Sequence, residues 1–141
     1  MGMYYNSSEV TGDWDSDVAG TDKPGNPLTV SNANRLYVTG LSARVVVDAE
    51  TDTIVITGRW QVSNDRTNWE DASPPNNAGN VAIATGTAGA DDTVTVNVSA
   101  PAGVYGAQFA RYVLVNTIVT GAVTDTYAIG YSYRAPGFEN F

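Results

Sequence analysis

The clearest hydrophobic pattern in the chain is a strict alternation of apolar and polar positions over residues 53–63. An alternation with a period of two predicts a long β-strand that has one dry face and one wetter face. The apolar side carries Ile54, Ile56, Trp60 and Val62. Gly58 interrupts this side, and a glycine inside a strand indicates either a bulge or a close approach by another backbone.

A polar turn follows this strand and ends at a second tryptophan. Residues 63–68 read Ser-Asn-Asp-Arg-Thr-Asn, and several of these side chains can hydrogen-bond to their own backbone. Trp60 and Trp69 therefore bracket one turn. Trp60 shares the apolar parity of the strand and is expected in the core, whereas Trp69 is not bound by that pattern.

Similar alternation recurs along the rest of the chain, between segments that are rich in Gly, Pro and Asn. Both faces of residues 109–119 are largely apolar, which predicts a central strand packed on both sides by core or by a neighbouring subunit. No segment has a helical period. About seven or eight strands joined by short turns predict an all-β fold, an antiparallel β-sandwich or jelly roll. The further strands are expected at 34–38, 44–47, 81–85, 93–98, 109–119 and 127–133.

The composition changes near residues 33 and 136 and divides the chain into three parts. Residues 1–33 are rich in Gly, Ser, Asp and Asn and lack any period, so we expect an extended N-terminal arm. Residues 34–135 form the predicted sandwich, and residues 136–141 form a short C-terminal tail. The arm is either a floppy tail or a segment that becomes ordered on a partner. Disordered tails are usually poor in aromatic residues, so three aromatics favour the ordered arm: Tyr4, Tyr5 and Trp14.

The composition also excludes several kinds of chemistry. The 141 residues include no Cys and no His, so the chain offers neither a thiolate metal site nor a Ser-His-Asp or Cys-His centre. A formal net charge of −8 disfavours binding to nucleic acids and to anionic membranes. The first residues lack the features of a signal peptide, and no apolar run reaches the length of a membrane helix. We therefore expect a protein that is made and used without Sec export.

Acidic residues are the remaining candidates for metal binding and catalysis. Asp13, Asp15 and Asp17 alternate as in a calcium loop, but no Gly and Glu follow at the EF-hand spacing, so a solvated acidic turn is the favoured interpretation. Paired carboxylates can hydrolyse glycosides, yet nothing in the pattern puts two acids on adjacent strand ends. We expect no enzyme activity, no metal and no cofactor.

Aromatic side chains are candidates for a binding surface. Trp69 could stack on a sugar ring, which is how many proteins bind glycans. Tyr131 and Tyr133 share one side of the last predicted strand with Tyr127 and Ile129. This row is either a core layer with hydroxyls at its rim or an exposed stripe at a subunit contact.

Two of these segments resemble small β-rich virion proteins of tailed bacteriophages. The run from Trp60 to Trp69, WQVSNDRTNW, is similar to a strand, polar turn and second tryptophan that form one corner of a β-sandwich in that family. Residues 110–115, ARYVLV, are similar to the penultimate strand of such domains. The family often has Gly after the turn aspartate, where this chain has Arg66. Together with the arm and the tail, these segments resemble capsid cement, or decoration, proteins.

The resemblance implies a structural role. Cement proteins are commonly trimeric β-structures at three-fold positions of the outer capsid surface, where they brace neighbouring capsomers. The expected partners are thus the major capsid protein and further copies of the chain in a homotrimer, on virions assembled in the host cytoplasm. The alternative is a carbohydrate- or receptor-binding module of a phage tail or fibre. Expected capsid contacts in the arm and tail are Tyr4, Tyr5, Trp14, Phe138 and Phe141, and expected subunit contacts are Arg111, Tyr131 and Tyr133.

Overall fold

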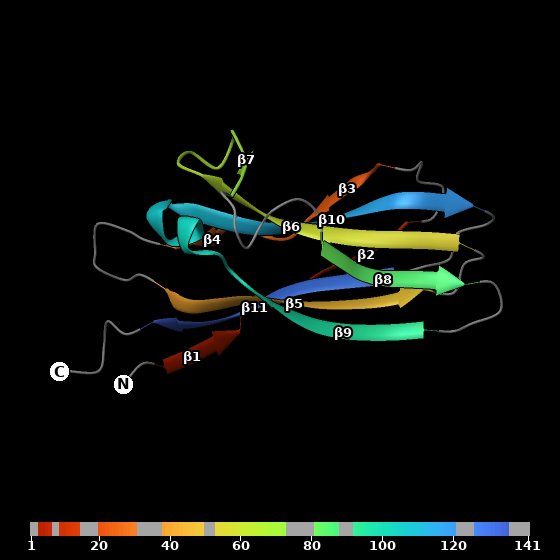
Figure 1. The fold of residues 1–141 in the computed structure, drawn as a ribbon. Helices are drawn as coiled ribbons and strands as arrows, with labels where there is room; N and C mark the ends of the chain where they lie inside the picture. The colour runs from red at the N-terminus through yellow and green to blue at the C-terminus, as the bar shows by residue number, and fades with distance from the viewer. Residues whose placement is uncertain are drawn as a thin grey trace.

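The protein is a β-sandwich of two antiparallel sheets, as the alternating pattern predicts (Figure 1). The computed structural model describes residues 3–6, 9–14, 20–30, 38–49, 53–72, 81–87, 92–120 and 126–135. The two sheets lie face to face, with the core between them. A short 3₁₀ helix, η1 (Ala102–Gly106), follows β9 and precedes β10 in the chain.

The first sheet has five strands in the order β1-β11-β5-β9, and β2 also pairs with β11. β5 pairs with β9 through eight consecutive residue pairs, from Ser42 opposite Ser99 to Ala49 opposite Asp92. Its strands are β1 (Met3–Asn6), β2 (Val10–Asp13), β5 (Thr39–Ala49), β9 (Asp92–Ser99) and β11 (Thr126–Ala135).

The second sheet has six strands in the order β3-β10-β6-β7, while β4 also pairs with β10 and β8 with β6. The long pairing of β6 with β10 forms its centre and contains one register shift, between Asn116 and Ile118. Its strands are β3 (Asp22–Pro24), β4 (Leu28–Thr29), β6 (Thr53–Ser63), β7 (Glu70–Asp71), β8 (Val81–Thr87) and β10 (Phe109–Thr120).

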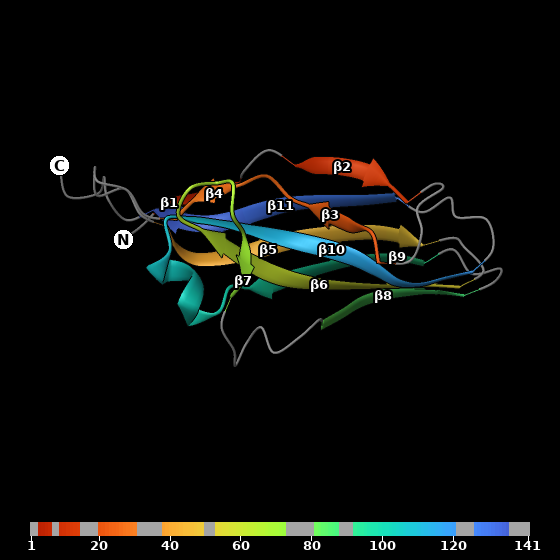
Figure 2. The same ribbon diagram turned by 90° about the horizontal axis from the view of Figure 1, so that it is seen from above.

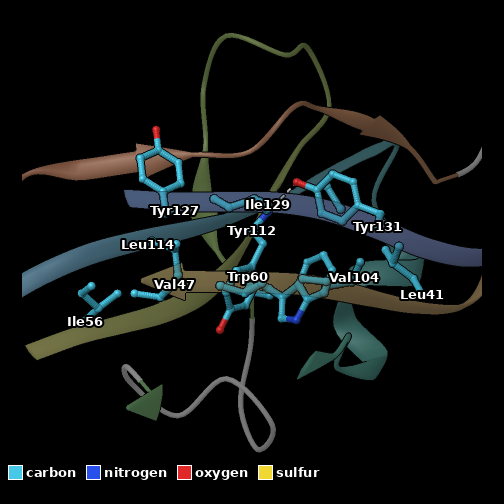
Figure 3. Packing of buried hydrophobic residues seen from close by; sticks show 14 of the residues in the cluster. Leu41, Val47, Ile56, Trp60, Val104, Tyr112, Leu114, Tyr127, Ile129 and Tyr131 are labelled. Carbon is cyan, nitrogen blue, oxygen red and sulfur yellow. Dashed lines mark hydrogen bonds between the residues drawn. The ribbon is translucent and has the colours of Figure 1, made fainter. Parts of the chain in front are cut away.

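The core is built from the apolar parity of the long strands (Figure 3). Trp60 on β6 is 1% exposed, which confirms its predicted place in the core. Its indole meets the ring of Tyr112 edge-on, with centroids 5.2 Å apart, and that of Tyr131 at 5.9 Å. Because Tyr131 comes from the other sheet, these aromatic contacts join the two layers.

Gly58 permits this packing. A Cβ atom at residue 58 would overlap the hydroxyl oxygen and the ring of Tyr112. The sequence predicted a bulge or a close backbone approach at Gly58. The ladder between β6 and β10 runs without a shift through Gly58 opposite Leu114, and the group that approaches is the aromatic ring of Tyr112.

The described residues before the predicted boundary at residue 33 pair with the two sheets of the sandwich. β1 and β2 pair with β11, and β3 and β4 pair with β10, so the described part of the predicted arm adds an edge to each sheet (Figure 2). Extended segments can satisfy their backbone groups on a sheet edge, where a proline such as Pro24 is tolerated. Their short, interrupted strands explain why the sequence shows no period there.

Two side chains anchor this N-terminal region. Trp14 is 0% exposed, and its ring centroid lies 4.7 Å from that of Tyr127. Asn116, at the register shift in β10, accepts a hydrogen bond from the backbone N–H of Thr21 at 2.8 Å through its side chain and one from that of Gly20 at 2.6 Å through its carbonyl. Buried contacts of this kind fix the segment to the body of the protein.

β10 is a central strand, as its two apolar faces predicted. It lies between β6 on one side and β3 and β4 on the other. Val113 and Val115, on the face turned away from the core, are only 1% and 7% exposed. These two valines are therefore shielded within the single chain.

Candidate functional site

The described residues contain no cluster of metal-ligating side chains. Within them, no group of three or more Asp or Glu side chains is arranged to hold a metal ion. Asp13 is exposed on the edge strand β2, while Asp15 and Asp17 lie outside the described residues, so the calcium interpretation stays open. None of the described helices is long and apolar enough to cross a membrane.

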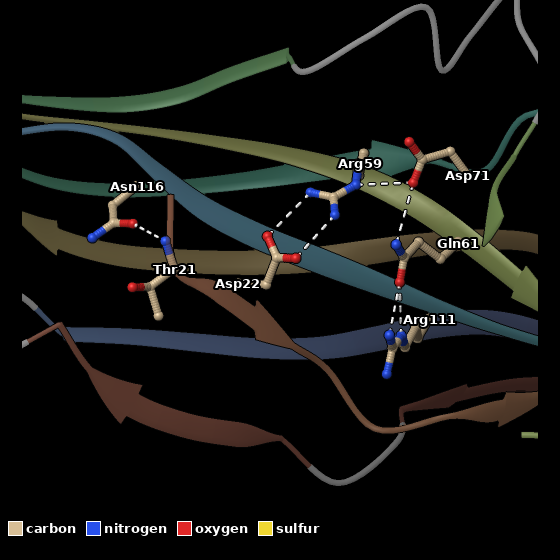
Figure 4. Close-up of polar contacts among 7 residues, drawn as sticks. All are labelled: Thr21, Asp22, Arg59, Gln61, Asp71, Arg111 and Asn116. Atoms are coloured by element: carbon tan, nitrogen blue, oxygen red, sulfur yellow. Dashed lines mark hydrogen bonds and ion pairs between the residues drawn. The ribbon is translucent and has the colours of Figure 1, made fainter. Parts of the chain in front are cut away.

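The most organised polar surface is the outer face of the six-stranded sheet, which we call the charged face: Asp22, Arg59, Gln61, Trp69, Asp71 and Arg111. The strand register creates it. Gln61 on β6 lies opposite Arg111 on β10 and opposite Asp71 on β7, and Arg59 lies opposite Val113. Figure 4 shows the hydrogen bonds that connect five of these side chains in the order Asp22, Arg59, Asp71, Gln61 and Arg111.

Arg59 is held by two carboxylates. Its Nε donates to Asp71 Oδ1 at 2.9 Å, and its Nη1 and Nη2 donate to the two carboxylate oxygens of Asp22 at 3.4 and 3.2 Å. Only 17% of the Arg59 side chain is exposed. Burial acts to lower the pKa of Arg59, but the hydrogen bonds to Asp22 and Asp71 prevail and raise it above its ordinary value. The charge of Arg59 is thus compensated within the chain.

Arg111 has a different environment. Its Nε and Nη2 both donate to the amide oxygen of Gln61, at 3.0 and 2.8 Å, and its guanidinium carbon lies 4.3 Å from the ring centroid of Trp69. Among the described residues, no carboxylate lies within 4.0 Å of it. Burial, together with the nearby charge of Arg59, lowers its pKa. Arg111 is a half-buried cation that a neutral amide and an aromatic ring position.

The turn after β6 holds Trp69 in place. Asp65 accepts hydrogen bonds from the backbone N–H groups of Asn68 and Thr67, each at 2.8 Å, and these bonds set its pKa well below the usual range. Arg66 has a φ of 64°, the left-handed conformation that glycine adopts most readily. Its carbonyl accepts a hydrogen bond from the indole N–H of Trp69 at 3.2 Å. Arg66 therefore adopts the conformation expected of the glycine that the resembled family has here.

The structure separates the residues predicted as contacts. Tyr131 is 2% exposed, and its hydroxyl accepts a hydrogen bond from the backbone N–H of Tyr112 at 2.9 Å. Within the single chain it belongs to the core layer, because its hydroxyl reaches the backbone of the other sheet. Trp14, predicted to contact the capsid, is likewise enclosed in the core of its own chain.

The other predicted contacts have varied places. Tyr133 packs partly buried against the core from β11. The backbones of Tyr4 and Tyr5 lie on β1 opposite Arg134 and Tyr133. Phe138 and Phe141 lie outside the described residues. Arg111 has a partly exposed side chain, so its prediction as a contact residue stays open.

Sequence reasoning missed most of the charged face. Arg59 and Gln61 belong to the wetter parity of β6, which marked them as outward-facing and nothing more. Asp22 and Asp71 come from short edge strands that carry no period, and the pairing of β3 with β10 and of β7 with β6 brings them to Arg59. One feature of the sequence could have indicated part of this face: Gln61 and Asp71 flank the polar turn at a spacing that allows their strands to pair.

Comparisons with known proteins identify the fold. No protein family model matches the sequence, and no curated protein sequence matches it. A chain in the structure of infectious bursal disease virus Gx strain superposes with a TM-score of 0.51 at 11% identity, covering 99% of this chain and 33% of that one. A chain from the Bacillus endospore appendages, described as disulfide-linked pili, superposes with a TM-score of 0.38 at 12% identity, covering 95% and 90%. The chain spans about a third of the viral chain, and that likeness shows a shared β-sandwich fold.

Proposed function

We propose that this protein is a structural virion protein, a capsid cement protein that binds the outer surface of a capsid and braces its capsomers. The β-sandwich fold shared with a chain of a viral structure supports this role, as does the resemblance of the Trp60–Trp69 corner to small phage virion proteins. The observation that carries the proposal furthest is the position of Arg111 on the charged face.

Arg111 is prepared to bind a carboxylate from another protein. A guanidinium offers five N–H donors in a rigid fork, and Gln61 takes only the donors on Nε and Nη2. Part of the desolvation of this half-buried cation is complete before any partner arrives, so a partner carboxylate gains a charge-assisted hydrogen bond at reduced cost. Arg59 is not a candidate for this role, because Asp22 and Asp71 already compensate its charge. Arg111 is thus our proposed contact with an acidic side chain of the major capsid protein.

The net charge of the chain fits a location on the outside of the shell. A protein with a charge of −8 is repelled by packaged DNA, and it keeps solubility before assembly in the host cytoplasm. A rigid sandwich with preset polar groups loses little conformational entropy when it docks. The mechanism is mechanical, since each bound copy adds contacts that must break before the capsomers can separate.

The test is binding to empty shells of the cognate major capsid protein, measured by co-sedimentation and by the temperature at which the shells rupture. We expect the wild-type chain to bind and to raise the rupture temperature, and Arg111→Gln to lose most of the binding. Arg44→Gln is the matched control, because Arg44 forms an exposed pair with Glu9 at 2.7 Å on the other sheet. A wild-type chain that does not bind shells would refute the cement role.

A glycan-binding module is the second candidate, and the position of Trp69 favours it. This indole is partly exposed beside the polar groups of Gln61 and Arg111, although the guanidinium covers one of its faces. Stacking of a sugar on the remaining face would then require Trp69 itself. A glycan array on which the wild type binds and Trp69→Ala does not would replace the cement proposal with this one.

A further inference from the structure

The five-stranded sheet ends at a strand that is unusually suited to pairing with another chain. β9 pairs with β5 on one side, and no described strand pairs with its other side. The register with β5 is continuous over eight residue pairs, so β9 is an unbroken edge. Between its ends it contains no Pro, Gly, Lys or Arg. Natural edge strands usually carry such residues, or a bulge, because an open edge is a template for another strand.

The other described edges each carry a feature that blocks pairing. The edge formed by β3 and β4 contains Lys23 and Pro24, and β7 is only two residues long, both acidic. β8 contains Gly86, and its register with β6 shifts between Ile56 and Thr57. The edge formed by β1 and β2 consists of two short strands of four residues each. Among the described edges, β9 is the one without protection.

The sequence of β9 is complementary to itself. Residues 93–99 read Thr-Val-Thr-Val-Asn-Val-Ser, which alternates polar and valine positions in the same way from either end. In an antiparallel pair centred on Val96, Val94 lies opposite Val98 of the second copy, and Thr95 lies opposite Asn97. Asp92, the charged residue of the strand, lies opposite Ala100 and not opposite a like charge. A shift of this register by one residue would place each valine opposite a polar residue of the second copy.

Two valines of β9, Val96 and Val98, are incompletely covered in the single chain. They share the core-facing side of the sheet with Val45 and Ala43, which lie opposite Val96 and Val98 and are fully buried. Val96 and Val98 themselves are only partly buried against the core. A second β9 in the centred register would place its own valines beside them and remove this apolar surface from water.

We propose that two copies of this chain associate by antiparallel pairing of β9 with β9 around a two-fold axis through Val96, joining two five-stranded sheets into one. Backbone hydrogen bonds along the edge would supply the attraction, and the alternation of valine and polar residues would set the register. The contact is an isologous one, so it gives a dimer and differs from the trimer that the resemblance implies. It concerns the isolated protein and does not depend on the capsid role.

The test uses the absence of cysteine from the chain, which makes any introduced cysteine unique. In the proposed dimer residue 96 lies opposite itself, at a Cα separation of about 4.5–5.5 Å that a disulfide can bridge. We expect Val96→Cys to form a disulfide-linked dimer under mild oxidation. Val10→Cys is the matched control, a partly buried valine on the opposite edge of the same sheet, and should stay monomeric on a non-reducing gel.

A second pair of variants keeps the test valid if Val96→Cys misfolds. The exposed positions Thr95 and Asn97 lie opposite each other in the proposed register, so a mixture of Thr95→Cys and Asn97→Cys proteins should yield the mixed disulfide. Replacing both residues by Lys places like charges opposite each other twice, and we expect the dissociation constant from sedimentation equilibrium to rise about tenfold. Thr11→Lys on β2, at the opposite edge of the sheet, should leave the dissociation constant of the dimer unchanged. A wild-type chain that sediments as a monomer or as a trimer, or equal cross-linking of Val96→Cys and Val10→Cys, would overturn the proposal.

Discussion

The interior of the sandwich and the charged face on its outer side are built by different rules. In the interior, rings from both sheets fit against one another and against glycines, as Tyr112 does against Gly58. On the charged face, position is fixed by strand register, and one arginine is compensated while its neighbour is not. Shape complementarity therefore determines the interior, whereas the outer face contains a cation, Arg111, that has no carboxylate within 4.0 Å among the described residues. Contact with other molecules is therefore expected from the outer face.

The largest expected effect tests whether Trp14 belongs to the interior. Replacing a fully buried tryptophan by alanine typically lowers the free energy of unfolding by about 3–5 kcal/mol, through lost transfer energy and the cavity that remains. We expect Trp14→Ala to cause a loss of this size in urea unfolding followed by circular dichroism. Trp69→Ala, on the charged face, should cost much less because Trp69 is partly exposed.

An N-terminal segment that acted as a free arm would give a different result. Trp14→Ala would then leave the unfolding midpoint where it is and would alter only binding to a partner. That outcome would support the predicted boundary between arm and sandwich at residue 33, and it would contradict a place for Trp14 in the interior.

The sequence predicted the interior better than its edges. Alternation identified β6 and its inward-facing Ile56 and Trp60, because a long strand repeats its pattern enough times to be recognised. It could not identify β3, which has three residues, or predict that Trp14 would fill the space beside Tyr127. Such short segments are positioned by the sheet edge that receives them, and that edge exists only after the fold has formed.

The charged face shows the same limit. Parity marked Arg59 as outward-facing, but its two carboxylates come from residues 22 and 71, which are far apart in the sequence. The sequence predicts Arg111 as a contact residue but gives no sign of its hydrogen bonds to Gln61 on the neighbouring strand. A sequence pattern indicates which face a side chain occupies, while its partners depend on pairings between distant strands.

The second prediction concerns the fit of Tyr112 on Gly58. We expect Gly58→Ala to lower the free energy of unfolding by about 1–3 kcal/mol, because the added Cβ would overlap the ring of Tyr112 and force it to move. Gly106→Ala is the control, since a Cβ there meets nothing within 4 Å. The measurement is chemical unfolding of both variants. Equal free energies of unfolding for Gly58→Ala and Gly106→Ala would mean that the ring of Tyr112 has space to shift. The packing of the interior would then be less tight than we infer.

The third prediction follows from the buried hydroxyl of Tyr131. Burial raises the pKa of Tyr131 to about 12, even though the hydrogen bond from Tyr112 acts in the opposite direction. The unfolded chain titrates near pH 10, so the unfolded state releases a proton between about pH 10 and 12 that the folded state retains. The contribution of Tyr131 to stability is complete below pH 10 and falls as the pH rises through this window, by up to about 3 kcal/mol for a shift of about two pKa units.

The comparison that isolates this residue is Tyr131→Phe. At pH 8 we expect the variant to be less stable by about 1 kcal/mol, because the backbone N–H of Tyr112 loses its acceptor. Between pH 10 and 11.5, denaturant unfolding should show a shallower loss of stability in the variant than in the wild type. Parallel curves for the two proteins would show that the Tyr131 hydroxyl is not held in the interior.

The smallest effects separate the two arginines of the charged face. Arg59→Gln leaves the carboxylates of Asp22 and Asp71 without their shared cation, and because both are more than half exposed we expect a loss of only about 1 kcal/mol. Arg111→Gln removes a half-buried cation, whose desolvation offsets its contact with Trp69, so its stability should change by less than about 0.5 kcal/mol. Urea unfolding at low and high salt measures both. Added salt should reduce the difference between Arg59→Gln and the wild type, since it screens the ion pairs. If Arg111→Gln were instead the more destabilised variant, the main role of Arg111 would be to stabilise the fold. The charged face would then offer no cation for a partner to bind.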